Sequence, residues 1–227
     1  MELAYNWFPP YSYNLALFVF ISGYFYKTDY EENIGKYIWK RTKRLLIPAY
    51  LWNIFYGGMV AFLGLFGFTI GAKPDLYNLF VMPFVDGEAF QYNLGSWFVY
   101  PLFLVCIINV LFRKFLKLIH LDNEFIVLIV YLAIGMIGIN TALENPTAIN
   151  GIVKLLVRTM FFLPCYEFGR FYKAVLEKKD TLNNVAYFAI IFAVQLILLT
   201  FCKDLEYTPS SFTKFNNGFI IPYISSI

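Results

Sequence analysis

Four basic side chains stand immediately before an apolar run, and they are called the basic cluster: Lys40, Arg41, Lys43 and Arg44. On a helix, residues three and four apart share a face, so Lys40 lies above Lys43 and Arg44. Guanidinium groups grip phosphate with two parallel hydrogen bonds, and ammonium groups add point charge. The cluster therefore predicts either a site for a soluble, nucleotide-like phosphate ligand or an anchor for anionic lipid headgroups.

The composition of the chain indicates that the basic cluster is carried by membrane helices. Of the 227 residues, 59% are hydrophobic and 15% are charged, whereas soluble domains carry about 25% charged residues. We therefore predict an all-α fold, a polytopic transmembrane helical bundle that forms a single membrane domain over residues 1–227. The three cysteines show no metal-site spacing, and we expect no metal.

Apolar runs long enough to approach the ~20 residues of a membrane span alternate with polar loops. Six membrane helices are expected, at residues 11–26, 45–70, 96–112, 124–142, 152–172 and 184–202. A seventh apolar run, 218–227, is truncated. Residues 75–92 are expected to form a loop with a short interfacial helix.

Basic residues are unevenly shared between the predicted loops. Loop 27–44 carries six bases, whereas loop 71–95 carries only Lys73. The positive-inside rule places base-rich loops in the cytoplasm. We therefore expect a multi-pass plasma-membrane protein whose loop 27–44 is cytoplasmic and whose N-terminus is extracytoplasmic, with the basic cluster acting as a topological anchor as well.

Two charged residues fall inside predicted membrane helices, where charge is costly and usually faces an interior or a cavity. Arg158 either extends its charge to the interface or contacts a carboxylate. Glu167 is expected to pair with Arg170, three residues on.

Uncharged residues in the same helices have structural interpretations. Ser22 and Gly23 predict close helix packing. Trp97 is expected to be an aromatic residue of the membrane interface. Asn53 fits a hydrogen bond between helices better than a substrate ligand.

Four motifs follow one another along the chain in a familiar order: "LFVFISGYFYK" at 17–27, "KRTKRLLIP" at 40–48, "GSWFVYPLF" at 95–103 and "FFLPCYEFGRFYK" at 161–173. They resemble successive signatures of the acyltransferase 3 family, which are integral-membrane O-acyltransferases. The residues that match are Ser22, Gly23, Tyr24, Arg41, Arg44, Pro48, Trp97, Phe98, Pro164, Phe168 and Gly169. The third motif is similar to the sugar O-acetylase branch.

This resemblance implies transfer of an acyl group, commonly acetyl, from acyl-CoA to a sugar hydroxyl of a surface or lipid-linked glycan, a form of polysaccharide modification. Acyl-CoA, or acetyl-CoA, would be a donor substrate rather than a bound cofactor. Its phosphates would meet Arg41 and Arg44, with Lys40 beside them. The same resemblance gives each of the other polar residues an alternative role: the acyl tunnel would be lined by Ser22 and Gly23, the acceptor sugar would contact Arg158 and stack on Trp97, and the donor entrance would be shaped by Glu167. The expected partners are membrane lipids, acyl-CoA and a glycan, and no nucleic acid.

One departure from the family pattern concerns catalysis. Family members carry an arginine and a catalytic histidine on their first membrane helix, whereas the one histidine here, His120, lies in a basic loop. We expect His120 to be a solvated loop residue and assign no catalytic residue. The chain is thus predicted to be an incomplete family member, inactive alone. The alternatives are a non-enzymatic, transporter- or flippase-like bundle and a structural remnant.

Overall fold

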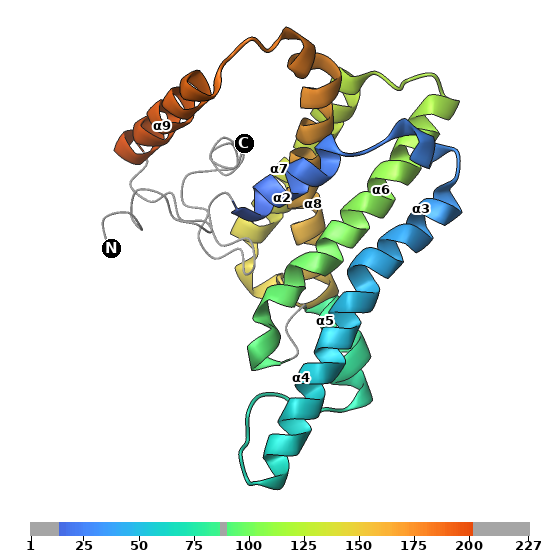
Figure 1. Cartoon of the computed structure of the whole chain (residues 1–227), viewed down its shortest axis with the longest axis vertical. Coiled ribbons are helices and arrows are strands. Elements are labelled where there is room, and N and C mark those ends of the chain that lie inside the picture. Colours follow the sequence, from blue (N-terminus) through green and yellow to red (C-terminus); the bar gives the residue numbers. More distant parts are fainter. Residues whose placement is uncertain (1–13, 87–89, 202–227) are drawn as a thin grey trace. The chain divides into compact units, whose positions relative to one another are not determined.

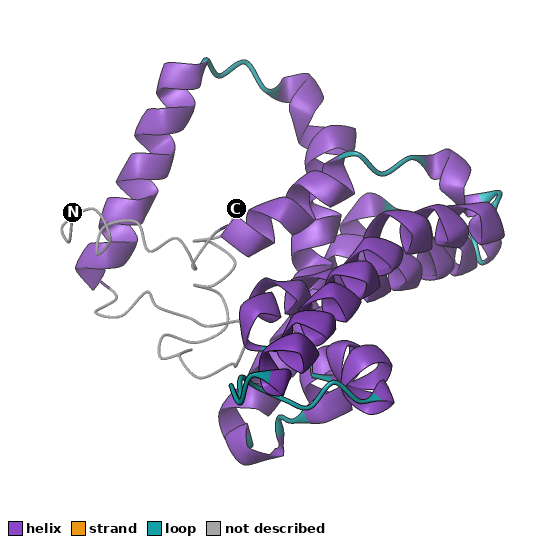
Figure 2. Cartoon of the chain, turned by 60° about the horizontal axis from the view of Figure 1, so that its bottom comes forward, coloured by secondary structure: helices purple, strands orange, loops and turns teal. Residues whose placement is uncertain are grey.

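The structure is a computed structural model that describes residues 14–86 and 90–201. Every regular element in these two ranges is helical (Figures 1 and 2), which confirms the all-α prediction for the described part of the chain. Contacts divide the chain into unit 1, which is Met1–Tyr26, Leu121–Pro146 and Met160–Ile227, and unit 2, which is Lys27–His120 and Thr147–Thr159. The apolar run at 218–227 lies outside the described residues.

A long helix dominates unit 2. It consists of α3 (Ile34–Arg41), a π turn (Thr42–Leu46) and α4 (Ile47–Leu65), preceded by a short 3-10 turn (Thr28–Glu31). Residues 34–44 are therefore helical and not a loop as expected, because no proline or glycine interrupts residues 36–47. The helix ends at Leu65, earlier than the expected residue 70, since Gly67 adopts a φ of +83°, which glycine does at little cost.

The rest of unit 2 includes three short helical elements, the long helix α6 and the beginning of α8. These are a π turn (Tyr77–Val81), α5 (Met82–Val85), a 3-10 segment (Gln91–Phe98), α6 (Val99–Leu118) and the first turns of α8 (Gly151–Phe171). A buried cluster of Ala49, Tyr100 and Leu155 joins α4, α6 and α8. The predicted short helix within 75–92 is confirmed as α5 and the turn before it.

Unit 1 consists of helices whose backbones approach closely. Its elements are α2 (Asn14–Tyr24), α7 (Glu124–Glu144), the end of α8, a π turn (Tyr172–Leu176), a 3-10 turn (Glu177–Lys179) and α9 (Asn184–Phe201). A Cβ atom at Gly23 would lie 1.8 Å from the carbonyl oxygen of Tyr166, and one at Gly169 would lie 2.0 Å from that of Phe20. Paired glycines thus let α2 cross α8, which confirms the packing interpretation of Gly23.

Three helices of the described chain are long and apolar enough to cross a membrane: Ile34–Leu65, Gly95–Leu118 and Glu124–Glu144. The other three expected segments are also largely helical in their described residues. Of these, α8 carries four charged side chains among its 21 residues, and α2 and α9 offer the shorter apolar stretches Leu15–Tyr24 and Asn184–Val194. A single domain of six spans stays a prediction.

Candidate functional site

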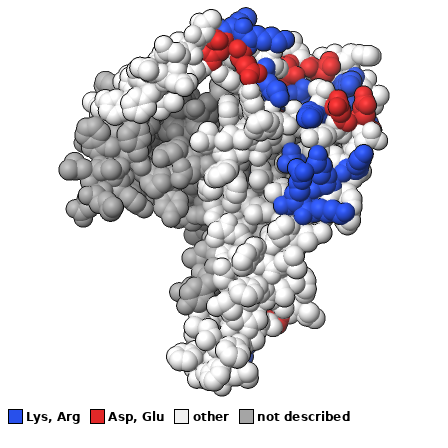
Figure 3. All heavy atoms as spheres, viewed as in Figure 1, with Lys and Arg blue, Asp and Glu red and all other residues white. Residues whose placement is uncertain are grey.

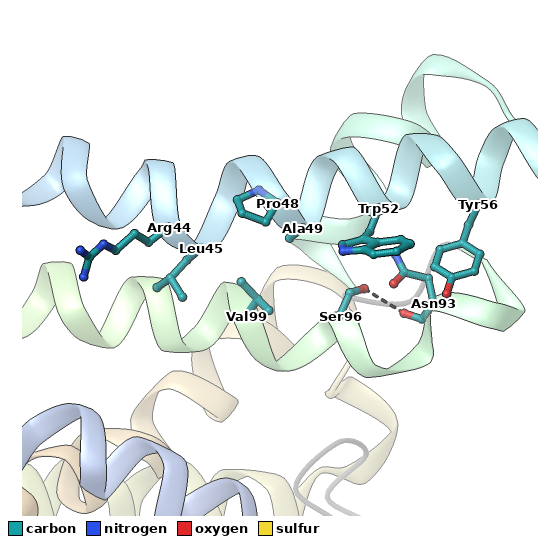
Figure 4. Close-up of a pocket in the computed structure, with 9 residues that line it drawn as sticks. All are labelled: Arg44, Leu45, Pro48, Ala49, Trp52, Tyr56, Asn93, Ser96 and Val99. Carbon is teal, nitrogen blue, oxygen red and sulfur yellow. Dashed lines mark hydrogen bonds between the residues drawn. The ribbon is translucent and has the colours of Figure 1, made fainter.

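A groove of about 310 Å³ opens in unit 2 between the long helix and the segment that leads into α6 (Figure 4). Its lining residues are Arg44, Leu45, Pro48, Ala49, Trp52, Tyr56, Asn93, Ser96 and Val99. Figure 4 shows Arg44 at one end and Tyr56 with Asn93 at the other. At 1.5 Å of rise per residue, the helical wall from Arg44 to Tyr56 extends about 18 Å. The groove therefore suits an elongated ligand with a negative charge at one end.

The cationic end of the groove lies on the π turn. There the Ile47 N–H donates to the carbonyl of Thr42, five residues earlier. Pro48 has no N–H, so it cannot donate to the carbonyl of Arg44, four residues before it. A wider turn accommodates this proline within a continuous helix, and such π turns are frequent at functional sites. The extra residue in the turn rotates the side chains that follow it.

The basic cluster is divided between aromatic rings and the groove. The Lys40 ammonium lies 5.5 Å from the ring centre of Tyr30, the Arg41 guanidinium 5.1 Å from that of Tyr37, and the Lys43 ammonium 5.0 Å from that of Trp39. Figure 3 shows lysine and arginine side chains gathered over α3. These contacts are cation–π pairs, which hold a cation in place without neutralising it.

Arg44 is the member of the cluster that lines the groove. Its side chain is exposed. Among the residues that the structure describes, it has no carboxylate, ring or hydrogen-bonding partner. Its charge is therefore available to an anion that enters the groove.

The polar wall of the groove depends on a buried asparagine. The Asn53 amide, fully buried on α4, donates to the carbonyls of Asn78 at 3.2 Å and Leu79 at 2.7 Å, and accepts from the Asn93 amide at 3.2 Å. Ser96 Oγ donates to the Asn93 carbonyl at 2.9 Å. Asn53 thus joins α4 to Asn78, Leu79 and Asn93 by hydrogen bonds, the kind of role that the sequence predicts for it.

Of the residues that line the groove, the sequence analysis singled out only Arg44 and Pro48. It missed the aromatic and polar ones, which are Trp52, Tyr56, Asn93 and Ser96. The two aromatic residues lie four apart on the helix that carries Pro48, so their shared face was readable from spacing. Nothing in the sequence indicated that Asn93 and Ser96 would lie opposite them.

Arg158 and Trp97, predicted separately, lie together in unit 2. The Arg158 guanidinium is 4.5 Å from the ring centre of Trp97, and its Nη1 donates to the Asp86 carbonyl at 2.9 Å. Arg158 is 1% exposed, so the interpretation in which it extends to the interface is wrong. One turn earlier, Lys154 Nζ lies 2.6 Å from Asp86 Oδ1. Contact of Arg158 or Trp97 with a sugar stays a prediction.

The other predicted site residues belong to unit 1. Ser22 Oγ donates to the carbonyl of Phe18 on its own helix at 2.9 Å. Glu167 is fully buried. Arg170 Nη2 donates to Glu124 Oε1 at 2.8 Å, a partner that the sequence prediction missed. A tunnel role for Ser22, Gly23 or Glu167 stays a prediction.

The histidine lies where the sequence placed it. His120 follows the end of α6, is exposed and has a φ of +56°. No group of His, Cys, Asp and Glu residues in the described ranges could hold a metal ion.

Three of the described helices are long and apolar enough to cross a membrane, and the groove headed by Arg44 lies along one of them. A model of the acyltransferase 3 family, described as an acyltransferase domain, matches residues 2–225. The match covers nearly the whole chain, and the chain belongs to this family. Neither the comparison with curated proteins nor that with solved structures returned a match.

Proposed function

We propose that the protein binds acyl-CoA, commonly acetyl-CoA, in the groove of unit 2, for transfer of the acyl group to a sugar hydroxyl of a surface or lipid-linked glycan. Membership of the acyltransferase 3 family supports acyl transfer as the reaction class. The observation that carries the donor site is the position of Arg44, an arginine without a partner in the described chain, at the head of an elongated groove.

Each part of the groove matches a part of this donor. Arg44 binds a phosphate through charge-assisted hydrogen bonds, and Lys40 and Arg41 add positive charge beside it. The apolar middle of the groove, which includes Leu45 and Val99, takes the flexible arm between the phosphates and the thioester. The polar groups at the far end offer hydrogen bonds near the acyl group.

Acetyl-CoA binding to the purified protein in lipid nanodiscs, measured by titration calorimetry, tests this proposal. Charge-assisted contacts contribute about 1.5–3 kcal/mol each, and about 1.4 kcal/mol is a factor of ten in affinity. Arg44→Ala should therefore weaken binding more than tenfold. Lys43→Ala is the matched control, because it removes an adjacent charge that lies over Trp39 and does not line the groove. Equal affinities for Arg44→Ala and the parent would overturn the donor site.

The orientation of the chain is a second part of the proposal. A soluble acyl-CoA reaches Arg44 only if the basic cluster faces the cytoplasm, as the six bases of residues 27–44 against one in 71–95 indicate. Single cysteines at Thr28 and Thr69, both exposed, would be tested in intact cells with a membrane-impermeant maleimide. We expect labelling at position 69 and none at position 28. The reverse pattern would contradict the orientation.

A further inference from the structure

The polar wall of the groove is formed by Asn93 and Ser96. The buried guanidinium of Arg158 contacts one residue before them in the chain and one residue after them. Arg158 donates to the carbonyl of Asp86 at 2.9 Å and lies 4.5 Å from the ring centre of Trp97. Between these two contacts along the chain are Asn93 and Ser96, the polar residues of the groove. Trp97 directly follows Ser96 in the sequence, so a shift of the ring moves the wall.

We infer that Arg158 is a positioning residue that sets the width of the groove by fixing Asp86 and the helical segment Gln91–Phe98 against α8. Arginine is suited to this task because its planar face stacks on an aromatic ring while its edge donates hydrogen bonds. Lysine has a compact charge and no plane, so it cannot make both contacts equally well. The inference rests on the proposed function where it concerns acetyl-CoA, and on geometry alone where it concerns the wall.

Lys154 supplies a comparison within the same helix. It lies one turn before Arg158 and pairs with the carboxylate of Asp86, with Nζ 2.6 Å from Oδ1. It is partly exposed. Among the described residues it pairs with Asp86 and makes no cation–π contact with Trp97. Loss of Lys154 should therefore leave Trp97 and the wall in place, which makes Lys154→Gln the matched control for Arg158→Gln.

The position of the wall can be measured without any ligand. Ser96→Cys would be introduced with the native cysteines replaced by alanine, and the reaction rate of the thiol at position 96 with a small maleimide would be recorded in nanodiscs. We expect Arg158→Gln to raise this rate about tenfold, because local opening then becomes easier. Lys154→Gln should change it less than about twofold, and Arg158→Lys should lie between the two.

Acetyl-CoA binding, measured with Ser96 intact, supplies the second readout. Arg158→Gln should weaken it roughly tenfold, since a displacement of about 1 Å in a binding site can cost that much or more. Arg158→Lys should recover part of the loss. The thermal unfolding temperature of each variant separates a displaced wall from a protein that no longer folds. If Arg158→Gln does not fold, Trp97→Leu removes the other half of the contact and should raise the thiol rate in the same way.

The two readouts keep this inference separate from the proposed function. If the parent protein does not bind acetyl-CoA, the proposed function fails, and the thiol rate alone decides the role of Arg158. If the thiol at position 96 reacts at the parent rate in Arg158→Gln, Arg158→Lys and Trp97→Leu, Arg158 does not position the wall and the inference is overturned.

Discussion

Arg170 of unit 1 and Arg44 of unit 2 are the same residue type in opposite circumstances. Arg170 is enclosed: its Nη2 lies 2.8 Å from Glu124 Oε1, its guanidinium lies 5.0 Å from the ring centre of Tyr26, and its side chain is 11% exposed. Arg44 is exposed at the head of the groove and has no such partner among the described residues. The first arrangement joins α8 to α7, whereas the second leaves a positive charge for a ligand.

The two units also differ in the contacts made by other residues: close backbone packing in unit 1, and cation–π contacts beside Arg44 in unit 2. In unit 1, helices α2 and α8 meet through Gly23 and Gly169, with each absent Cβ facing a backbone carbonyl. In unit 2, the cations beside Arg44 lie over aromatic rings, which fix them without cancelling their charge. In this comparison the partner of a cation, more than the cation itself, distinguishes an arginine that joins two helices from one that lines the groove.

The largest expected effect concerns the glycine crossing of unit 1. Gly23→Ala or Gly169→Ala should destabilise the fold by about 3 kcal/mol, because the added methyl meets backbone atoms that cannot rotate away. Gly58→Ala is the control, since a Cβ there meets nothing within 4 Å. Unfolding in an SDS titration measures the difference. Equal stability of all three variants would show that α2 and α8 do not cross as closely as described.

Loss of the enclosed ion pair should have the next largest effect. Arg170→Gln should lower the free energy of unfolding by about 2 kcal/mol, the usual value for a charge-assisted hydrogen bond, without changing acetyl-CoA affinity. Glu124→Gln tests the other partner, and the double variant should lose less than the sum of the two. Weaker acetyl-CoA binding in Arg170→Gln would contradict the division of roles between Arg170 and Arg44.

A smaller effect is expected from the arginine beside the groove. Arg41→Ala should weaken acetyl-CoA binding by roughly threefold at low salt and less at high salt, because it acts through a charge that ions screen over about 10 Å. Titrations at two salt concentrations measure this. A loss larger than that of Arg44→Ala would move the phosphate contact from Arg44 to Arg41.

The smallest expected effect tests the rings that hold the cluster. Trp39→Leu removes the ring beneath Lys43 and should cost about 0.5 kcal/mol of stability, the lower value for an exposed cation–π pair, with acetyl-CoA affinity unchanged. Trp52→Leu is the matched variant on the same long helix, because Trp52 lines the groove, and it should weaken binding. If both variants bind acetyl-CoA alike, Trp52 does not contact the donor.

Hydrophobic runs were enough to predict the apolar helices, although not α3, which carries the basic cluster. The predicted segment 124–142 corresponds to α7, Glu124–Glu144, and 152–172 corresponds to α8, Gly151–Phe171. Local patterns of this kind predict helices because backbone hydrogen bonds within a membrane must be made inside each segment. The helix end at Leu65 was missed, since it depends on the backbone conformation of Gly67 and not on hydropathy.

The sequence places four basic residues before an apolar segment at residues 40–48, and this concentration of positive charge follows from the types and order of the residues alone. It did not determine which cation would line the groove, since the π turn at 42–46 breaks the 3.6-residue period on which the shared face was predicted. Only the tertiary structure placed Asp86 and Trp97 around Arg158, and Glu124 beside Arg170, 46 residues away in the chain. Such pairings depend on how helices pack, and no spacing along a single helix encodes them.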